Sequence, residues 1–139
     1  MVIDKEDSAR LFFEANAFAV AGASHQRHKF GNQIFRALTE QFATVYPLNP
    51  VAQTVEGVPA FKTLSNLPLV PESVCIVTPP AVTLAIVQEA MTLGVRSIWI
   101  QPGAMHCVVK DLAKSGGINL IADGRCVLIE LRHLNFLYG

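Results

Sequence analysis

Five short apolar segments, spaced at nearly regular intervals, place the strongest limit on how this chain can fold. Their starts lie about 21 to 29 residues apart, close to the length of one strand followed by one helix. Each segment is continuously apolar, as is typical of strands that are covered on both faces. They are FAVAG at 18–22, TVYPL at 44–48, SVCIVT at 73–78, SIWIQ at 97–101 and INLIA at 118–122.

Helical patterns lie between these segments. Three apolar stripes follow helical spacing: Ile34, Phe35, Leu38 and Phe42; Val82, Ile86, Ala90 and Leu93; and Val108, Val109, Leu112 and Ala113. Gly94 can end the second helix, and the glycines at 116–117 can end the third. We also expect a helix near 7–15, capped by Asp4 or Asp7, and a helix or extended segment through CVLIELRHL.

The connection at 49–72 differs from the others because its prolines interrupt any helical pattern. We expect a long loop there, with a short strand near 55–58 and one helical turn near 63–67. The residues that break the pattern are Pro50, Gly57, Pro59, Pro68 and Pro71.

Strands that alternate with helices predict an α/β fold. We expect a mostly parallel sheet of five or six strands, with right-handed crossovers and helices on both faces. A length of 139 residues, 51% of them hydrophobic, is enough for a single domain that covers residues 1–139.

Charge and composition exclude several classes of function. The formal net charge of +0 argues against general nucleic-acid binding, which normally needs a basic face. No apolar run reaches the roughly 18 residues of a membrane helix, and the polar N-terminus has no signal-peptide pattern. We therefore expect a cytoplasmic protein. Three cysteines without C-x-x-C spacing give no metal or disulfide signal.

The loop after the first apolar segment carries the most distinctive polar pattern. Gly22 allows a tight turn, and Ser24 can cap a following turn or offer its hydroxyl to a phosphate. The next residues bring potential cations, and Gly31 permits close approach where a helix begins. This pattern favours a phosphorylated ligand, and the alternative is a solvated polar loop. The cations are His25, Arg27, His28 and Lys29.

The other predicted strands also end in polar or conformationally restricted residues. The second ends in Asn49 and Pro50 with no acidic residue, and no G-x-G-x-x-G is present, so the NAD-binding fingerprint is missing. After the third strand, Thr78 can cap the next helix, with Pro79-Pro80 in its first turn. Ligands of open parallel sheets bind beyond these carboxyl ends.

These strand ends, taken in order, resemble a known family. The matching pieces are VAGAS with KFGN, YPLNP, VTPPAVTLAIVQEA, WIQPGA and GRCVLIELRHL, which cover roughly residues 15–135. Together they are similar to the CoA-binding Rossmann-type domain, both as a small stand-alone protein and as the N-terminal domain of succinyl-CoA synthetase α subunits. The resemblance implies a three-layer, Rossmann-like, doubly wound sheet with CoA along its carboxyl edge.

The resemblance also implies a role for individual residues. The phosphates would meet Gly22, Ser24 and Lys29, and the adenosine would lie beside Asn49 and Pro50. Lys29 is the first choice for a phosphate contact because it lies beside Gly31, where close approach is possible, and Arg27 is the second. The nucleotide would pack on Val77, Thr78, Pro79 and Pro80, and the pantetheine would pass Gln101 and Gly103.

We therefore expect non-catalytic binding of coenzyme A or an acyl-CoA. The sequence has no Ser-His-Asp order and no pair of carboxylates that would indicate an enzyme. We expect His106 to be a polar loop residue and Cys126 to be a thiol in the core. Two alternatives stay open. One is an NADP-binding oxidoreductase-like domain, in which Arg27 or Lys29 accepts the 2′-phosphate. The other is an interaction protein whose pocket has lost its ligand, or a protein that senses CoA for a partner.

Apolar residues in the terminal segments allow two arrangements. They can dock on the protein's own sheet, or they can form the contact surface of a homodimer. The residues concerned are Phe12, Phe13, Leu134, Phe136, Leu137 and Tyr138.

Overall fold

The core of the protein is a parallel sheet built from the five apolar segments. The computed structural model describes the backbone of residues 4–138 and the side chains of residues 4–134. Within that range the sheet has five strands, in the order β2-β1-β5-β6-β7, and every neighbouring pair is parallel. Each strand lies within two residues of its predicted bounds: β1 (Phe18–Ala21), β2 (Val45–Leu48), β5 (Ser73–Ile76), β6 (Ser97–Ile100) and β7 (Asn119–Ile121).

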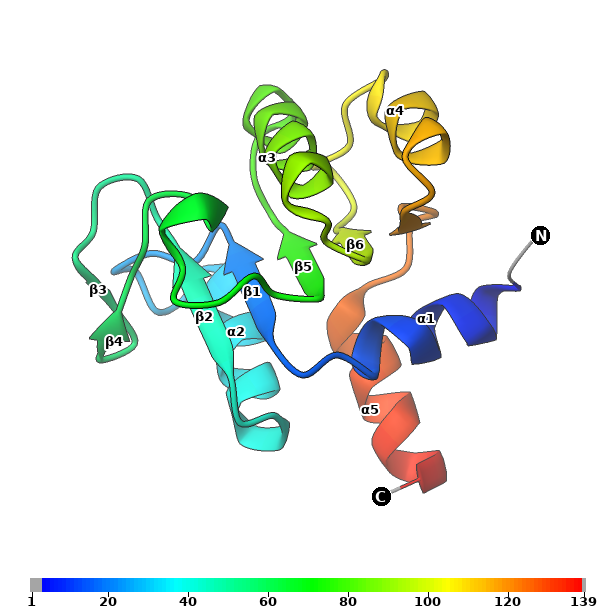
Figure 1. Ribbon diagram of the computed structural model, residues 1–139. Coiled ribbons are helices and arrows are strands. Elements are labelled where there is room, and N and C mark those ends of the chain that lie inside the picture. The colour runs from blue at the N-terminus through cyan, green and yellow to red at the C-terminus, as the bar shows by residue number, and fades with distance from the viewer. Residues whose placement is uncertain (1–3, 139) are drawn as a thin grey trace.

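Helices cover both faces of this sheet (Figure 1), which confirms the predicted three-layer, doubly wound α/β architecture. One face carries α1 (Lys5–Phe13), α2 (Phe30–Gln41) and α5 (Val127–Tyr138). The other carries α3 (Pro80–Leu93), α4 (Val109–Ser115) and the short 3-10 helix η1 (Leu64–Asn66). No helix within residues 4–138 is long and apolar enough to cross a membrane.

Alternation along the strands divides the core into two halves. Phe18 and Val20 of β1 pack toward α1, α2 and α5, whereas Ala19 and Ala21 pack toward α3. All four residues are buried, so both faces require apolar side chains. This two-sided burial explains why the strands appear in the sequence as unbroken apolar runs.

The connection from β2 to β5 contains a hairpin where one short strand was expected. β3 (Thr54–Val55) and β4 (Val58–Pro59) pair antiparallel, so the turn falls inside the predicted strand at 55–58. Glu56 and Gly57 form this turn with φ of 51° and 79°, the left-handed values of a type I′ turn. The expected helical turn near 63–67 is η1.

The N-terminal helix docks on the protein's own sheet. The backbone N–H of Asp7 donates to Asp4 Oδ1 at 2.8 Å, so Asp4 is the cap. Phe12 and Phe13 are buried, with ring centroids 5.3 and 5.7 Å from that of Trp99. These two rings are therefore not available to a dimer surface, while Leu134 packs partly against the same core. The homodimer stays a prediction, and the side chains of Phe136, Leu137 and Tyr138 lie outside the described part.

Candidate ligand-binding cleft

The strand order creates a crevice between the carboxyl ends of β1 and β5. The chain leaves β1 for β2 on one side and returns to β5 on the other, and such a switch point is where open α/β sheets bind ligands. A cleft of about 580 Å³ lies there. Eight of the predicted site residues line it: Gly22, Ser24, Lys29, Asn49, Pro50, Val77, Thr78 and Pro79.

Two glycines allow the backbone segments at the base of this cleft to touch. Gly22 has φ of 115°, and a Cβ at this position would collide with the carbonyl oxygen of Val77 at the end of β5. A Cβ on Gly31, in the first turn of α2, would stand 2.5 Å from the carbonyl oxygen of Gly22. Gly31 therefore shapes the cleft without lining it, because it lets α2 begin directly against the β1 loop.

The loop after β1 is held by the buried Asn32 of α2. The backbone N–H of Ser24 donates to Asn32 Oδ1 at 2.9 Å, and Asn32 Nδ2 donates back to the Ser24 carbonyl at 2.7 Å. The Ser24 hydroxyl accepts from the backbone N–H of Gln26 at 3.1 Å, which confirms that Ser24 caps a turn. Sequence reasoning missed Asn32, since an asparagine inside a helical stripe gives no sign of such a contact.

Asn49 joins the end of β2 to the same loop. Its Nδ2 donates to the carbonyl of Ala23 at 3.0 Å, and its Oδ1 accepts from the backbone N–H groups of Val51 and Ala52 at 2.9 and 2.7 Å. These bonds form an Asx turn at the Asn-Pro pair. Asn49 therefore holds two walls of the cleft together.

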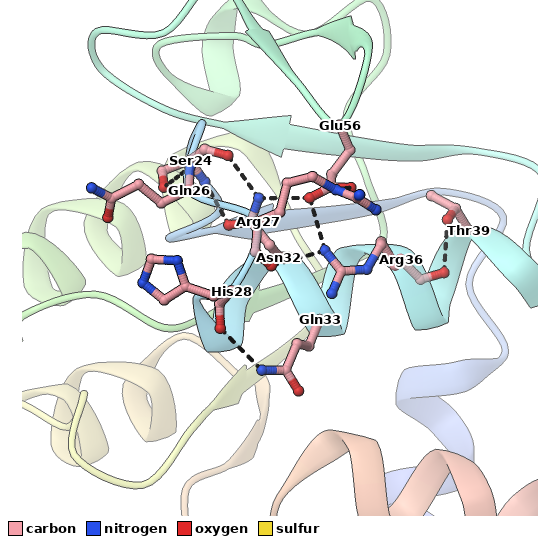
Figure 2. Close-up of polar contacts among 9 residues, drawn as sticks. All are labelled: Ser24, Gln26, Arg27, His28, Asn32, Gln33, Arg36, Thr39 and Glu56. Carbon is pink, nitrogen blue, oxygen red and sulfur yellow. Dashed lines mark hydrogen bonds and ion pairs between the residues drawn. The ribbon is translucent and has the colours of Figure 1, made fainter.

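Arg27 points toward the β3–β4 hairpin rather than lining the cleft. Its Nε donates to Glu56 Oε1 at 3.0 Å, and Arg36 Nη1 donates to Glu56 Oε2 at 2.9 Å (Figure 2). Arg36 Nη1 also donates to the carbonyl of Arg27 at 2.9 Å. The guanidinium of Arg27 thus already has an anionic partner, and its contact with a ligand phosphate stays a prediction.

A second lysine lines the cleft instead. Lys62 follows Phe61, which forms a parallel bridge with Leu48 at the end of β2 and so brings this connection to the sheet edge. Lys29 and Lys62 are the basic residues among the described residues that line the cleft, and both are exposed. Sequence reasoning missed Lys62 because it lies in the proline-rich connection and follows none of the predicted strands.

The acidic residue that lines the cleft is engaged with η1. Glu89 of α3 accepts hydrogen bonds from the backbone N–H groups of Leu64 and Ser65 at 2.9 and 3.3 Å, and from the Ser65 hydroxyl at 2.7 Å. These bonds satisfy the start of the 3-10 helix. The side chain therefore anchors the connection that carries Lys62.

The α3 side of the cleft is largely apolar. Val77, Pro79, Val82 and Ile86 contribute to this wall. The N-cap of α3 is Pro79, which makes no side-chain bond, so the expectation that Thr78 caps this helix is wrong. The Thr78 hydroxyl instead lies 2.8 Å from the hydroxyl of Thr83, one turn into the helix, because Pro79 and Pro80 occupy its start.

Besides Arg27 and Gly31, three more predicted site residues lie outside the lining of the cleft. Gln101 is only 3% exposed; its Oε1 accepts from the backbone N–H of Val127 at 2.7 Å, and its Nε2 contacts Cys126 Sγ at 3.5 Å. Gln101 therefore holds the start of α5. Pro80 and Gly103 are exposed. Ligand contacts by Pro80, Gln101 and Gly103 stay predictions.

The Glu56 carboxylate beside this loop has a pKa below its ordinary value. The hydrogen bond from Asn32 lowers the pKa of Glu56; Arg27 and Arg36 lower it further, and together they outweigh burial, which by itself would raise it. A lowered pKa in the folded state means that the ionised carboxylate stabilises the fold. This contribution is complete above the ordinary glutamate pKa of about 4.3 and is lost as the pH falls through the lowered folded-state value.

Replacing Glu56 with glutamine should therefore remove part of the acid sensitivity of the fold. Between pH 7 and strongly acidic pH, the wild type should lose more free energy of unfolding than Glu56→Gln, because only the wild type must protonate this carboxyl. Urea unfolding of both proteins across this pH range measures the difference. Equal losses would show that the ionised form of Glu56 does not stabilise the fold.

The fold and the cleft define an open, doubly wound α/β domain with a cleft at its switch point, the place where such sheets bind ligands. Residues 16–132 match the family model described as CoA binding domain, so the chain belongs to the CoA binding domain family. A hypothetical protein from Pyrococcus horikoshii OT3 has the same fold, with a TM-score of 0.86 and 25% identity over 99% of this chain and 94% of that one.

Two curated relatives are much longer proteins. The alpha subunit of ADP-forming acetate–CoA ligase II from Pyrococcus furiosus is 33% identical over 90 residues, which are 64% of this chain and 20% of the relative. ADP-forming acetate–CoA ligase I from Archaeoglobus fulgidus is 26% identical over 122 residues, which are 81% of this chain and 18% of the relative. The chain thus spans about a fifth of the curated relatives that it matches.

Proposed function

We propose that this protein binds coenzyme A or an acyl-CoA in the cleft between β1 and β5, without catalysing a reaction on it. The observation that carries the proposal is the cleft itself. It lies at the switch point of a CoA binding domain, and it combines two lysines with an apolar wall. The cytoplasmic location and the homodimer stay predictions.

The two kinds of surface in the cleft suit the two kinds of surface on CoA. The phosphate groups of CoA need cations and backbone donors, which Lys29, Lys62 and the start of α2 provide. The adenine ring and the pantetheine arm need apolar contacts, which Val77, Val82 and Ile86 provide. An uncharged ligand would leave both lysines without a role.

Binding without catalysis is the simplest reading of the residues around the cleft. No histidine, cysteine or aspartate is among the described residues that line it. The carboxylate of Glu89 already accepts three hydrogen bonds from η1. A general acid, base or nucleophile for a bound thioester would have to come from elsewhere.

A thermal-shift panel with CoA, acetyl-CoA, NAD and NADP separates the candidate functions. A ligand present at 100 times its dissociation constant stabilises the native state by about 2.7 kcal/mol, so CoA and acetyl-CoA should each raise the melting temperature. A shift with NADP alone would favour the oxidoreductase-like alternative. If none of the four compounds shifts the melting temperature, the better hypothesis is an interaction protein whose pocket has lost its ligand.

A further inference from the structure

The turn of the β3–β4 hairpin carries an unusual residue. Glu56 is the only non-glycine residue between positions 4 and 138 with a positive φ. The first position of a type I′ turn normally holds asparagine, aspartate or glycine, which adopt this conformation more readily. Observed backbone strain of this kind raises the question of what the side chain does in return.

The side chain of Glu56 joins three segments of the protein. It is only 7% exposed. Both carboxylate oxygens are used: Oε1 accepts from Arg27 Nε at 3.0 Å, and Oε2 accepts from Asn32 Nδ2 and Arg36 Nη1 at 2.9 Å each. Figure 2 shows these three side chains converging on the Glu56 carboxylate from the β1–α2 loop and from α2.

The contact with Asn32 extends this network to the cleft. Asn32 Nδ2 is shared between Glu56 and the Ser24 carbonyl, and Asn32 Oδ1 accepts from the Ser24 backbone N–H. Every polar atom of the Asn32 amide is therefore committed, and two of its three bonds hold Ser24. Ser24 lines the cleft, whereas Glu56 does not.

We propose that Glu56 is a positioning residue for the ligand: through Asn32 and Arg27 it holds the loop from Ser24 to Lys29 in the shape that lines the cleft. The inference rests on the proposed function of this cleft. A loop that is already ordered before binding does not lose conformational freedom when the ligand binds. The protein therefore binds the ligand more tightly than it would with a mobile loop. The strained turn of the β3–β4 hairpin places the Glu56 side chain within reach of the β1–α2 loop.

Three variants test the role of Glu56. Glu56→Gln keeps the size of the side chain and removes its charge. Glu56→Asn suits the turn better but shortens the side chain, so the hairpin persists while the contacts are lost. Glu40→Gln is the matched control, because Glu40 is exposed near the end of α2 and lies outside the network.

Titration calorimetry with CoA and amide hydrogen exchange at Ser24 are the two measurements. We expect Glu56→Gln and Glu56→Asn to weaken CoA binding about tenfold, which corresponds to about 1.4 kcal/mol. Without ligand, the Ser24 amide should exchange faster in both variants than in the wild type, and saturating CoA should slow it again. Glu40→Gln should match the wild type in both measurements.

The opposite results are equally clear. If both Glu56 variants bind CoA as the wild type does at a temperature where all proteins are folded, Glu56 has only a structural role and the proposal is overturned. If the wild type does not bind CoA, the proposed function fails. In that case the exchange of the Ser24 amide without ligand still tests the effect of Glu56 on the loop, and unchanged exchange overturns it.

Discussion

Replacing Lys29 with alanine should weaken CoA binding about tenfold to a hundredfold, because a charge-assisted hydrogen bond contributes roughly 1.5–3 kcal/mol. Lys29 is exposed and lines the cleft directly before α2, where the helix N-terminus also favours an anion. Arg27, the other strong candidate in this loop, is paired with Glu56. The fold should survive, because the Lys29 side chain makes no hydrogen bond to cap α2. Titration calorimetry of wild type and variant measures the loss.

Lys114→Ala is the matched control for Lys29→Ala. Lys114 lies in the last turn of α4, and a crossover helix ends at the sheet edge opposite the carboxyl ends of the strands. Its removal changes the net charge equally and should leave CoA affinity unchanged. Dephospho-CoA adds a second comparison: it should be less affected by Lys29→Ala if Lys29 contacts the 3′-phosphate, and equally affected if Lys29 contacts the pyrophosphate. If Lys29→Ala and the wild type bind CoA with equal affinity, the basic loop is a solvated surface and does not contact the phosphates.

Replacing Gly22 with alanine should destabilise the fold by about 3 kcal/mol and abolish CoA binding. The left-handed backbone costs an alanine about 1–2 kcal/mol, and forcing a methyl group into a packed site adds about 1–3 kcal/mol. The added Cβ would meet the carbonyl oxygen of Val77, so β1 and β5 must separate at the base of the cleft. Urea unfolding gives the change in free energy, and calorimetry gives the loss of binding.

Gly103→Ala separates the two costs of Gly22→Ala. Gly103 has φ of 94°, but a Cβ there would have no neighbour within 4 Å, so only the backbone cost applies. This variant should lose about 1–2 kcal/mol of stability. If Gly22→Ala is no less stable than Gly103→Ala, the close contact between the ends of β1 and β5 does not constrain the cleft.

The sheet could be predicted from the sequence because its signal is local. The central strands β1, β5 and β6 are buried along their whole length, and the edge strands β2 and β7 are partly buried. The sequence therefore shows a largely apolar run for each strand, which differs from the observed strand by two residues or fewer. Two helix ends followed equally local rules: Asp4 caps α1, and Gly94 ends α3 in the left-handed conformation, whereas the expected Thr78 cap at the start of α3 is absent. The hairpin turn at Glu56 lacked such a signal, since glutamate is not a typical residue for that position.

The interactions around the cleft could be predicted only in part. Residues directly after β1 and β2, such as Ser24 and Asn49, line the cleft as parallel-sheet geometry requires. The partner of Arg27 lies 29 residues away along the chain, so no sequence pattern distinguishes an arginine for a phosphate from one for Glu56. Gln101 also follows a strand, but the packing of α5 turns its side chain into the core.

Native mass spectrometry of the purified protein, titrated with CoA, tests the central claim most directly because it reports both occupancy and stoichiometry. We expect one CoA to bind per chain, and we expect Lys29→Ala, but not Lys114→Ala, to require a higher CoA concentration to form the complex. If the protein stays free of ligand at a saturating concentration of CoA, or if it binds NADP instead, the assignment of this cleft to coenzyme A is contradicted.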